Sequence, residues 1–188
     1  MPKSSLPPQQ DNGVVKVVGT YPKAGLHIYE IVKGLLQSPE PEAVEDWDLA
    51  FQVASTVISV GGDGAGVKVP DGRALYRWHF EDGELFPQRL MALASFITDL
   101  VDDGETVLVH CAAGVNRSGL VSALVVRELT GCSGLSARIQ VQTMRPGALI
   151  NPAYRKFLDD LPMLESAVES DGKITAETTT LLKGNTDA

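Results

Sequence analysis

The fold of this chain is decided by the stretch VLVHCAAGVNRSGL, residues 107–120. Its first part, together with Thr106, is an apolar and mostly β-branched run that is typical of a buried strand. The residues after it, 120–129, carry apolar side chains at helical spacing and indicate a helix that ends near Gly131. Glycines in the segment between the two runs predict a tight loop. The stretch therefore predicts a strand, a loop and a helix in direct succession.

The predicted loop has the features of an anion-binding site. Its successive backbone N–H groups can point inward, and the N-terminus of the following helix adds partial positive charge. Gly114 and Gly119 allow a positive φ or a close approach of the backbone. Arg117 carries a planar guanidinium that matches two phosphate oxygens at once. The predicted substrate-binding residues are Ala112, Ala113, Gly114, Val115, Asn116 and Arg117.

Cys111 is the candidate nucleophile at the start of this loop. A free thiol has a pKa of about 8.5, and a helix N-terminus with a neighbouring cation lowers it, so a thiolate is expected at neutral pH. Ser118 is placed to donate a hydrogen bond to the sulfur when the sulfur leaves in a second step. His110 is expected to orient Cys111 and its loop through hydrogen bonds rather than to act as a base. The alternative is that Cys111 is a small buried apolar residue without chemistry.

The pattern His-Cys-x5-Arg-Ser, from His110 to Ser118, resembles the signature of the cysteine-dependent protein tyrosine phosphatases. The wider stretch, residues 107–120, is most similar to the dual-specificity branch of that family. The resemblance implies a two-step hydrolysis of a phosphate ester through a cysteinyl-phosphate intermediate, with Arg117 at the phosphate. We therefore expect a protein phosphatase that acts on phosphotyrosine, with phosphoserine and phosphothreonine as further candidate substrates.

The leaving group of such a reaction needs a proton, which a carboxylic acid on a separate loop usually gives. Asp82 is the candidate general acid and base, because it lies on a glycine-containing loop between a predicted strand and a predicted helix. The general acid of dual-specificity phosphatases occupies a similar place, before the helix that precedes the signature. Glu81 and Glu84 of the same loop are rivals for this role.

Two further residues have alternative interpretations. Two stretches, Arg145-Pro146 and residues 151–154, resemble the family segment that packs beneath the signature loop, which is residues 111–117 in this chain. Arg145 is expected either to brace that loop or the acid, or to be a surface arginine at a helix end. Cys132 lies at the other end of the predicted helix, about 18 Å from the loop at the usual rise per residue. That distance is too long for a disulfide with Cys111, so we expect Cys132 to be a buried spacer.

Composition limits the partners of the chain. Its 188 residues carry a net charge of −8 without a Lys/Arg cluster, so neither nucleic acid nor a membrane is expected as a partner. No apolar run approaches the ~18 residues of a membrane span, and residues 1–13 lack the apolar core of a secretion signal. Two cysteines indicate a reducing, cytoplasmic location. We expect a monomer that needs no cofactor and no metal ion and acts on a phosphorylated protein or peptide.

The chain is predicted to hold one phosphatase domain, residues 14–168, between a flexible tail, residues 1–13, and a polar tail, residues 169–188. Helices alternate with buried strands along this domain. That order predicts an α/β fold of the tyrosine-phosphatase type, with a central, mainly parallel sheet flanked by helices on both faces. The signature loop then lies at the carboxyl end of a central strand, where such sheets bind ligands.

The remaining elements are predicted from their spacing. Strands are expected at residues 14–18, 26–29 and 55–60, with further strand material at 67–69 and 74–80, and residues 31–36 are ambiguous between strand and helix. Helices are expected at residues 43–52, 87–101 and 135–144 and from Pro152. Asn151 is expected to cap the last of these helices, in which Tyr154 is one of the inward residues. The side chains expected to face inward in the first and third of these helices are Val44, Trp47, Phe51, Leu135, Ile139, and Val141 or Met144. The glycine-rich residues 61–66 fail the spacing of a dinucleotide-binding motif and are expected to form a mobile loop.

Three other functions stay open at this point. A phosphoinositide or RNA 5′-phosphatase would want cations inside the loop, where residues 112–116 are neutral. A non-catalytic phosphate-binding module predicts loss of the cysteine or the acid, whereas Cys111 and Asp82 are both present. Sulfur transfer and arsenate reduction use a similar loop, but the former rarely needs Arg-Ser here and the latter needs further positioned thiols.

Overall fold

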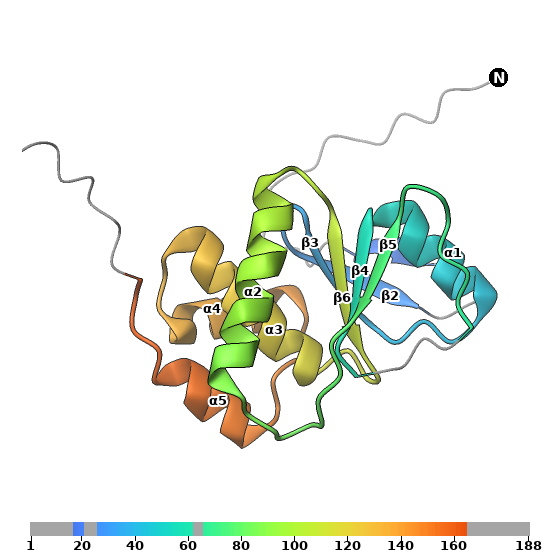
Figure 1. Ribbon diagram of the computed structural model, residues 1–188. Coiled ribbons are helices and arrows are strands. Elements are labelled where there is room, and N and C mark those ends of the chain that lie inside the picture. Colours follow the sequence, from blue (N-terminus) through green and yellow to red (C-terminus); the bar gives the residue numbers. More distant parts are fainter. Residues whose placement is uncertain (1–16, 21–25, 62–65, 165–188) are drawn as a thin grey trace, which may run out of the picture.

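The computed structural model describes residues 17–20, 26–61 and 66–164 (Figure 1). The two predicted tails, residues 1–13 and 169–188, lie outside the described residues, and so do residues 14–16 of the first predicted strand. The domain boundaries at residues 14 and 168 therefore stay predictions.

The described strands form one six-stranded sheet in the order β1-β2-β3-β6-β4-β5. Strands β3, β6, β4 and β5 run parallel to one another, and β2 pairs antiparallel with both β1 and β3. The sheet is thus mainly parallel, as predicted. The strands are β1 (Val17–Thr20), β2 (His27–Val32), β3 (Leu35–Pro39), β4 (Thr56–Ser59), β5 (Ala74–Arg77) and β6 (Val107–Cys111).

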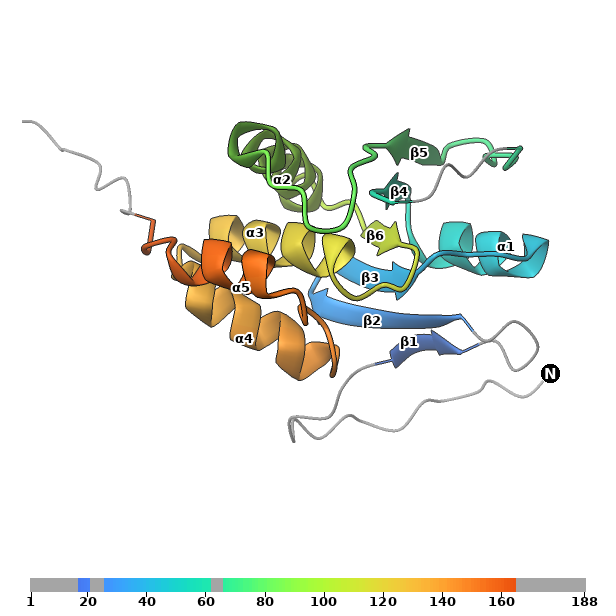
Figure 2. The ribbon, with the colours of Figure 1, turned by 90° about the horizontal axis from the view of Figure 1, so that it is seen from below.

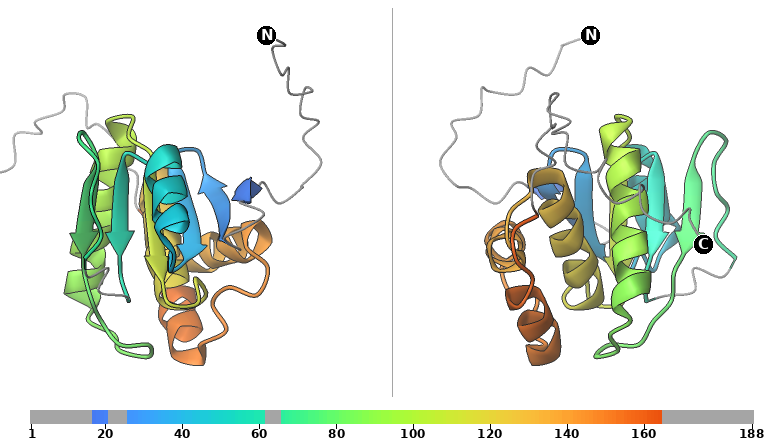
Figure 3. Two further views of the ribbon diagram at one scale, coloured as in Figure 1. Left: turned by 90° about the vertical axis from the view of Figure 1, so that its right-hand side faces the viewer. Right: turned by 60° about the vertical axis from the view of Figure 1, so that its left-hand side comes forward.

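Helices cover both faces of this sheet, which confirms the predicted fold class. They are α1 (Val44–Val53), α2 (Pro87–Asp102), α3 (Arg117–Thr130), α4 (Gly134–Met144) and α5 (Pro152–Asp159). Helix α1 lies on one face, whereas α2 to α5 gather on the other (Figure 2; Figure 3, left). Within the described residues no single helix is long and apolar enough to cross a membrane, and the pair α3 and α4 meets that test only with a bend of 119° between the two helices.

Strand β6 lies at the centre of the sheet between β3 and β4, and all of its residues are buried. Successive side chains of a strand point to opposite faces of a sheet. Val107, Val109 and Cys111 therefore belong to the apolar core under α2 to α5, and Leu108 belongs to the core under α1. The same alternation places the side chain of His110 on the α1 side of the sheet.

The structure decides the conformation of residues 31–36 and of residues 67–69. Residues 31–36 form a hairpin rather than a helix, because β2 and β3 pair antiparallel across Gly34, whose φ of 86° suits glycine. Residues 67–69 form no strand, so that prediction is wrong. Strand β5 begins only at Ala74, where its backbone comes into register with Thr56 of β4.

Helix α1 occurs as predicted, but one of its expected inward residues points outward. Trp47 and Phe51 are buried in the core under α1. Val44, by contrast, is 73% exposed and lines an open groove between α1 and residues 66–71. The prediction for Val44 is therefore wrong, because the side chain at the start of α1 lines that groove instead of the core.

Helix α4 is rotated relative to its predicted orientation. Leu135 and Ile139, both expected inward, are 41% and 51% exposed, whereas Gly134 and Val141 are buried. A Cβ atom at Gly134 would lie 2.1 Å from the carbonyl oxygen of Leu158, so α4 begins in direct contact with the end of α5. This close approach turns the 134/141 side of the helix toward the core.

Candidate active site

The loop between β6 and α3 lies at the carboxyl edge of the parallel strands, as predicted (Figure 2). Cys111 is the last residue of β6, and Arg117 is the first residue of α3. Neighbouring strands end at the same edge, since Pro39 of β3 pairs with Cys111 and Ser59 of β4 pairs with His110. The positive end of the α3 dipole is thus directed at the loop.

Cys111 and Ser118 are in contact inside this loop. The Sγ atom of Cys111 is buried and lies 3.3 Å from the Oγ atom of Ser118, in the first turn of α3. A serine hydroxyl can donate one hydrogen bond and rotates to suit its acceptor. The two side chains are therefore arranged so that the hydroxyl can stabilise negative charge on the sulfur.

Gly114 fixes the path of the loop against β3. Its φ is 61°, and a Cβ atom there would lie 2.3 Å from the backbone nitrogen of Pro39 and 2.5 Å from the carbonyl oxygen of Ser38. Backbone atoms cannot move away cheaply, so no other residue fits, as the sequence predicts. The N–H of Gly114 donates to the carbonyl of Cys111 at 3.0 Å. This amide was expected to bind an anion, but in this conformation it closes a turn instead.

Arg145 braces the loop from outside, which decides between the two interpretations of this residue. Its Nε donates to the carbonyl of Gly114 at 2.5 Å and its Nη2 to the carbonyl of Ala113 at 3.1 Å. The guanidinium also stacks 4.7 Å from the ring centroid of Tyr29. From β3, the buried amide of Gln37 donates to the same Gly114 oxygen at 3.0 Å. These contacts hold the loop carbonyls outward, away from the site of an anion.

The guanidinium of Arg117 lies between two backbone carbonyl groups. Its Nη1 donates to Phe80 at 3.1 Å and, with a longer contact, to Gly61 at 3.5 Å. A Cβ atom at position 61 would lie 2.6 Å from the Cζ of Arg117, so the guanidinium needs a glycine there. Gly61 was expected only to begin a mobile loop, and the following residues 62–65 lie outside the described part of the chain.

The three carboxylates of residues 81–84, here called the acid loop, have different partners. The carboxylate of Glu81 contacts Nε2 of His79 at 3.1 Å, and that of Glu84 accepts the backbone N–H of Glu81 at 2.9 Å. The carboxylate of Asp82 accepts the side-chain amide of Asn116 at 2.8 Å. Asp82 is therefore the acid that is joined to the signature loop.

Asn116 and Asn151 together hold Asp82 at the loop. One oxygen of Asp82 accepts from Nδ2 of Asn116, and the other accepts from Nδ2 of Asn151 at 2.9 Å. The backbone N–H of Asn151 in turn donates to Oδ1 of Asn116 at 3.0 Å. Asn151 also caps α5, as predicted, through the N–H of Ala153. The side chain of Asn116 therefore positions the acid, whereas the sequence placed this residue among the phosphate ligands.

His110 does not make the hydrogen bonds expected of it. Both of its ring nitrogens are buried without a partner in the described part of the protein. The ring packs edge-on against Trp47, with the ring centroids 5.4 Å apart, on the sheet face opposite the core that contains Cys111. Burial lowers the pKa of His110 to about 4, so the imidazole is neutral at neutral pH. The predicted role of His110 is corrected accordingly: it fills the core beside Trp47.

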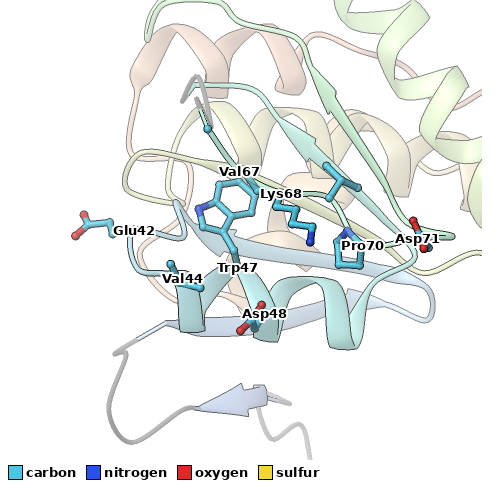
Figure 4. Close-up of a pocket in the computed structure, with 10 residues that line it drawn as sticks. Glu42, Val44, Trp47, Asp48, Val67, Lys68, Pro70 and Asp71 are labelled. Carbon is cyan, nitrogen blue, oxygen red and sulfur yellow. The ribbon is translucent and has the colours of Figure 1, made fainter.

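A groove of about 620 Å³ lies on the α1 side of the sheet (Figure 4). It is lined by Val44 and Trp47 of α1 and by residues 66–71. Its lining contains none of the residues around Cys111, so it is separate from the candidate active site. Within the described residues, no group of three or more His, Cys, Asp and Glu side chains is arranged to hold a metal ion.

Four residues of the site were not assigned to it from the sequence: Gln37, Gly61, Asn151 and Tyr154. Asn151 and Tyr154 were expected as a helix cap and a buried helix residue, in a segment that resembles one packing beneath the signature loop, and both contact the acid loop. All four act across long sequence separations. Their spacing relative to the signature therefore carries no local signal, apart from the resemblance of residues 151–154 to a family segment.

Comparisons with known proteins agree with this geometry. Residues 68–133, from before β5 to the end of α3, match the model of the tyrosine phosphatase family. No curated protein sequence matches the chain.

Solved structures with the same fold are similar over most of their length. Tk-PTP in its active form aligns with a TM-score of 0.61 and 23% identity, over 70% of this chain and 95% of that one. A mouse putative dual-specificity phosphatase complexed with zinc tungstate aligns with a TM-score of 0.61 and 22% identity, over 75% of this chain and 89% of that one. PTPMT1 in complex with PI(5)P aligns with a TM-score of 0.59 and 19% identity, over 70% of this chain and 92% of that one.

The fold is thus that of the dual-specificity phosphatases, and the signature lies in it where the sequence places it. The family match over residues 68–133 and this fold agree with the resemblance of the chain to the dual-specificity branch of the cysteine-dependent tyrosine phosphatases. These findings support a phosphatase on this fold with a phosphorylated substrate.

Proposed function

We propose that the chain is a protein phosphatase that hydrolyses phosphotyrosine through a cysteinyl-phosphate intermediate. Phosphoserine and phosphothreonine are further candidate substrates. One observation carries the proposal: Asp82, from the loop before α2, is hydrogen-bonded to Asn116 of the same loop that holds Cys111 and Arg117. A nucleophile, a guanidinium and a carboxylic acid from three separate elements thereby meet at one edge of the sheet.

In the first proposed step, the thiolate of Cys111 attacks the phosphorus atom. The S–P bond forms, the P–O bond to the leaving group breaks, and Asp82 gives its proton to the departing oxygen. Arg117 binds two of the phosphoryl oxygens, whose charge it stabilises during transfer.

In the second proposed step, water attacks the phosphorus of the intermediate. Asp82 takes a proton from the water, the P–S bond breaks, and the thiolate and inorganic phosphate are released. Ser118, whose Oγ lies 3.3 Å from the sulfur, donates a hydrogen bond to the thiolate as it leaves.

The cations near the loop favour a substrate with a single phosphate. Arg117 is the only cation of residues 111–119. Arg145 uses its guanidinium on the carbonyls of Gly114 and Ala113, and Arg155 donates to the carbonyl of Leu149. Neither arginine is therefore free in this conformation to bind a second phosphate. The net charge of −8 also disfavours a polyanionic substrate.

A phosphoinositide is the second candidate substrate class. The support for it is that PTPMT1, a structural neighbour, was solved in complex with PI(5)P. We further propose that the protein works in the reducing cytoplasm, because both described cysteines are free and the mechanism needs Cys111 as a thiolate.

The test is a panel of substrates hydrolysed by the purified full chain: a phosphotyrosine peptide, its phosphothreonine counterpart, a phosphoinositide in vesicles, and an RNA with a 5′-triphosphate. The control is Cys111→Ser, which keeps the loop but lacks the nucleophile. We expect the highest kcat/KM with the phosphotyrosine peptide and no turnover with the variant. A higher kcat/KM with the phosphoinositide would overturn the substrate class, and no turnover with any substrate would overturn the enzymatic function.

A further inference from the structure

The hydroxyl of Tyr154 lies between the two peptide groups that flank Asp82. Tyr154 comes from α5, and its side chain is 0% exposed. Its Oη accepts the N–H of Gly83 at 2.7 Å and donates to the carbonyl of Glu81 at 3.2 Å. One hydroxyl thereby holds the backbone on both sides of the candidate general acid.

The acid loop needs such a contact. Residues 81–84 are all exposed, and Gly83 has a φ of 98°, in the region that favours glycine. A short, solvated segment with a glycine has little conformational preference of its own. The loop conformation must therefore be fixed from outside, and the start of α5 supplies the contacts through Tyr154 and Asn151.

We propose that Tyr154 is a positioning residue for catalysis, which holds the acid loop so that Asp82 faces the leaving group. The inference rests on the proposed function and deepens it by naming the group that orders the acid. Burial raises the pKa of Tyr154 to about 12, so the hydroxyl keeps its proton and can donate and accept together at neutral pH.

Tyr154 and Asn151 divide this task. Asn151 contacts the carboxylate itself, whereas Tyr154 contacts only backbone atoms of the neighbouring residues. Loss of the Tyr154 hydroxyl would thus leave the carboxylate and its two amide partners in place. Its removal should increase the conformational freedom of residues 81–83 without changing the chemistry of the acid.

The main variant is Tyr154→Phe, which removes the hydroxyl and keeps the buried ring. Tyr76→Phe is the matched control, because Tyr76 lies on β5 with its ring against Phe96. We expect Tyr154→Phe to lower kcat about tenfold for an alkyl or tyrosyl phosphate, a part of the roughly 10²–10⁴-fold effect of a general acid. With a nitrophenyl-type phosphate, whose leaving group needs no proton, the loss in the cysteine-phosphorylation step should disappear. KM should change little with either substrate.

Two further measurements separate positioning from a structural role. In an Asp82→Asn background, Tyr154→Phe should have no further effect on kcat for the alkyl phosphate, since it acts through the acid that is already lost. Backbone amide exchange of residues 81–84 should become faster in Tyr154→Phe, with Tyr76→Phe unchanged.

The outcomes are distinguishable. Equal losses with both leaving groups in the cysteine-phosphorylation step, additive losses in the double variant, or unchanged amide exchange would each overturn the role of Tyr154 while leaving the proposed function in place. An inactive wild-type protein would overturn the proposed function and with it the catalytic part of this inference. The leaving-group dependence, the non-additivity and the faster exchange, found together, would establish it.

Discussion

His110 gives a quantitative prediction, because its neutral imidazole is buried without hydrogen bonds beside Trp47. Its pKa falls from 6.5 in the unfolded chain to about 4 in the folded protein. Between these two values the unfolded state binds a proton that the folded state does not. The contribution of neutral His110 to the free energy of unfolding is therefore fully present above pH 6.5 and is lost as the pH falls toward 4.

The size of the effect follows from the shift. Each unit of pKa difference corresponds to about 1.4 kcal/mol, so the full shift is worth about 3 kcal/mol, of which about 2 kcal/mol is already lost at pH 5. The variant His110→Leu has a side chain of similar volume that does not titrate. It should therefore lack this share of the pH dependence, whatever its absolute stability.

The assay is denaturant unfolding of both proteins at pH 7.5 and pH 5. Between these pH values the wild type should lose about 2 kcal/mol more of its free energy of unfolding than the variant, because the two proteins differ in no other titratable group. In the folded wild type, the ring proton signals of His110 should move by only about a tenth of the full titration change between pH 8 and pH 5. An equal loss in both proteins, or an imidazole that titrates near 6.5 in the folded state, would refute the buried, neutral histidine.

Three further predictions concern the site. Gly61→Ala should lower kcat by about 10²-fold by displacing Arg117, with the fold unchanged by circular dichroism, and a near-wild-type kcat would contradict the tight contact at 2.6 Å. Arg145→Met should cost about 1–3 kcal/mol in denaturant unfolding by removing its bonds to the loop carbonyls, whereas Lys156→Met, at an exposed ion pair with Asp160, should cost clearly less. Asp82→Asn should lower kcat for an alkyl phosphate by roughly 10²–10⁴-fold and remove the fall in rate at high pH. The control Glu81→Gln should show neither effect, and the reverse result would show that Glu81 is the acid.

The local parts of the site could be predicted from the sequence. The strand, loop and helix around Cys111 follow from short-range spacing, and so does the need for glycine at position 114. Asp82 could be proposed because a loop between a strand and a helix is itself a local pattern. Its advantage over Glu81 and Glu84 appears only in the fold, where Asn116 reaches it.

The contacts between distant segments could not be predicted. The position of the Arg117 guanidinium depends on how closely Gly61, two residues after β4, approaches it, and the sequence around neither residue shows this distance. The hydrogen bonds between Tyr154 and the acid loop depend in the same way on how α5 packs. The orientation of α4 was missed because Gly134, a small residue in a polar stretch, sets it through contact with α5.

The error at His110 had a different cause. The alternation of side chains along β6 already places His110 and Cys111 on opposite faces of the sheet. A signature that joins the two residues in sequence suggests a shared role, but their side chains enter different cores.

The central claim is that Cys111 carries the phosphoryl group during turnover. Its most direct test is rapid quenching of Asp82→Asn during reaction with a nitrophenyl-type phosphate, followed by mass spectrometry of the peptide that contains Cys111. Because the variant lacks the base that activates water, the intermediate should accumulate. The account predicts one added phosphoryl group on Cys111, and no such adduct when Cys111→Ser is added to the variant. Turnover without an adduct at Cys111, or turnover that survives Cys111→Ser, would contradict it.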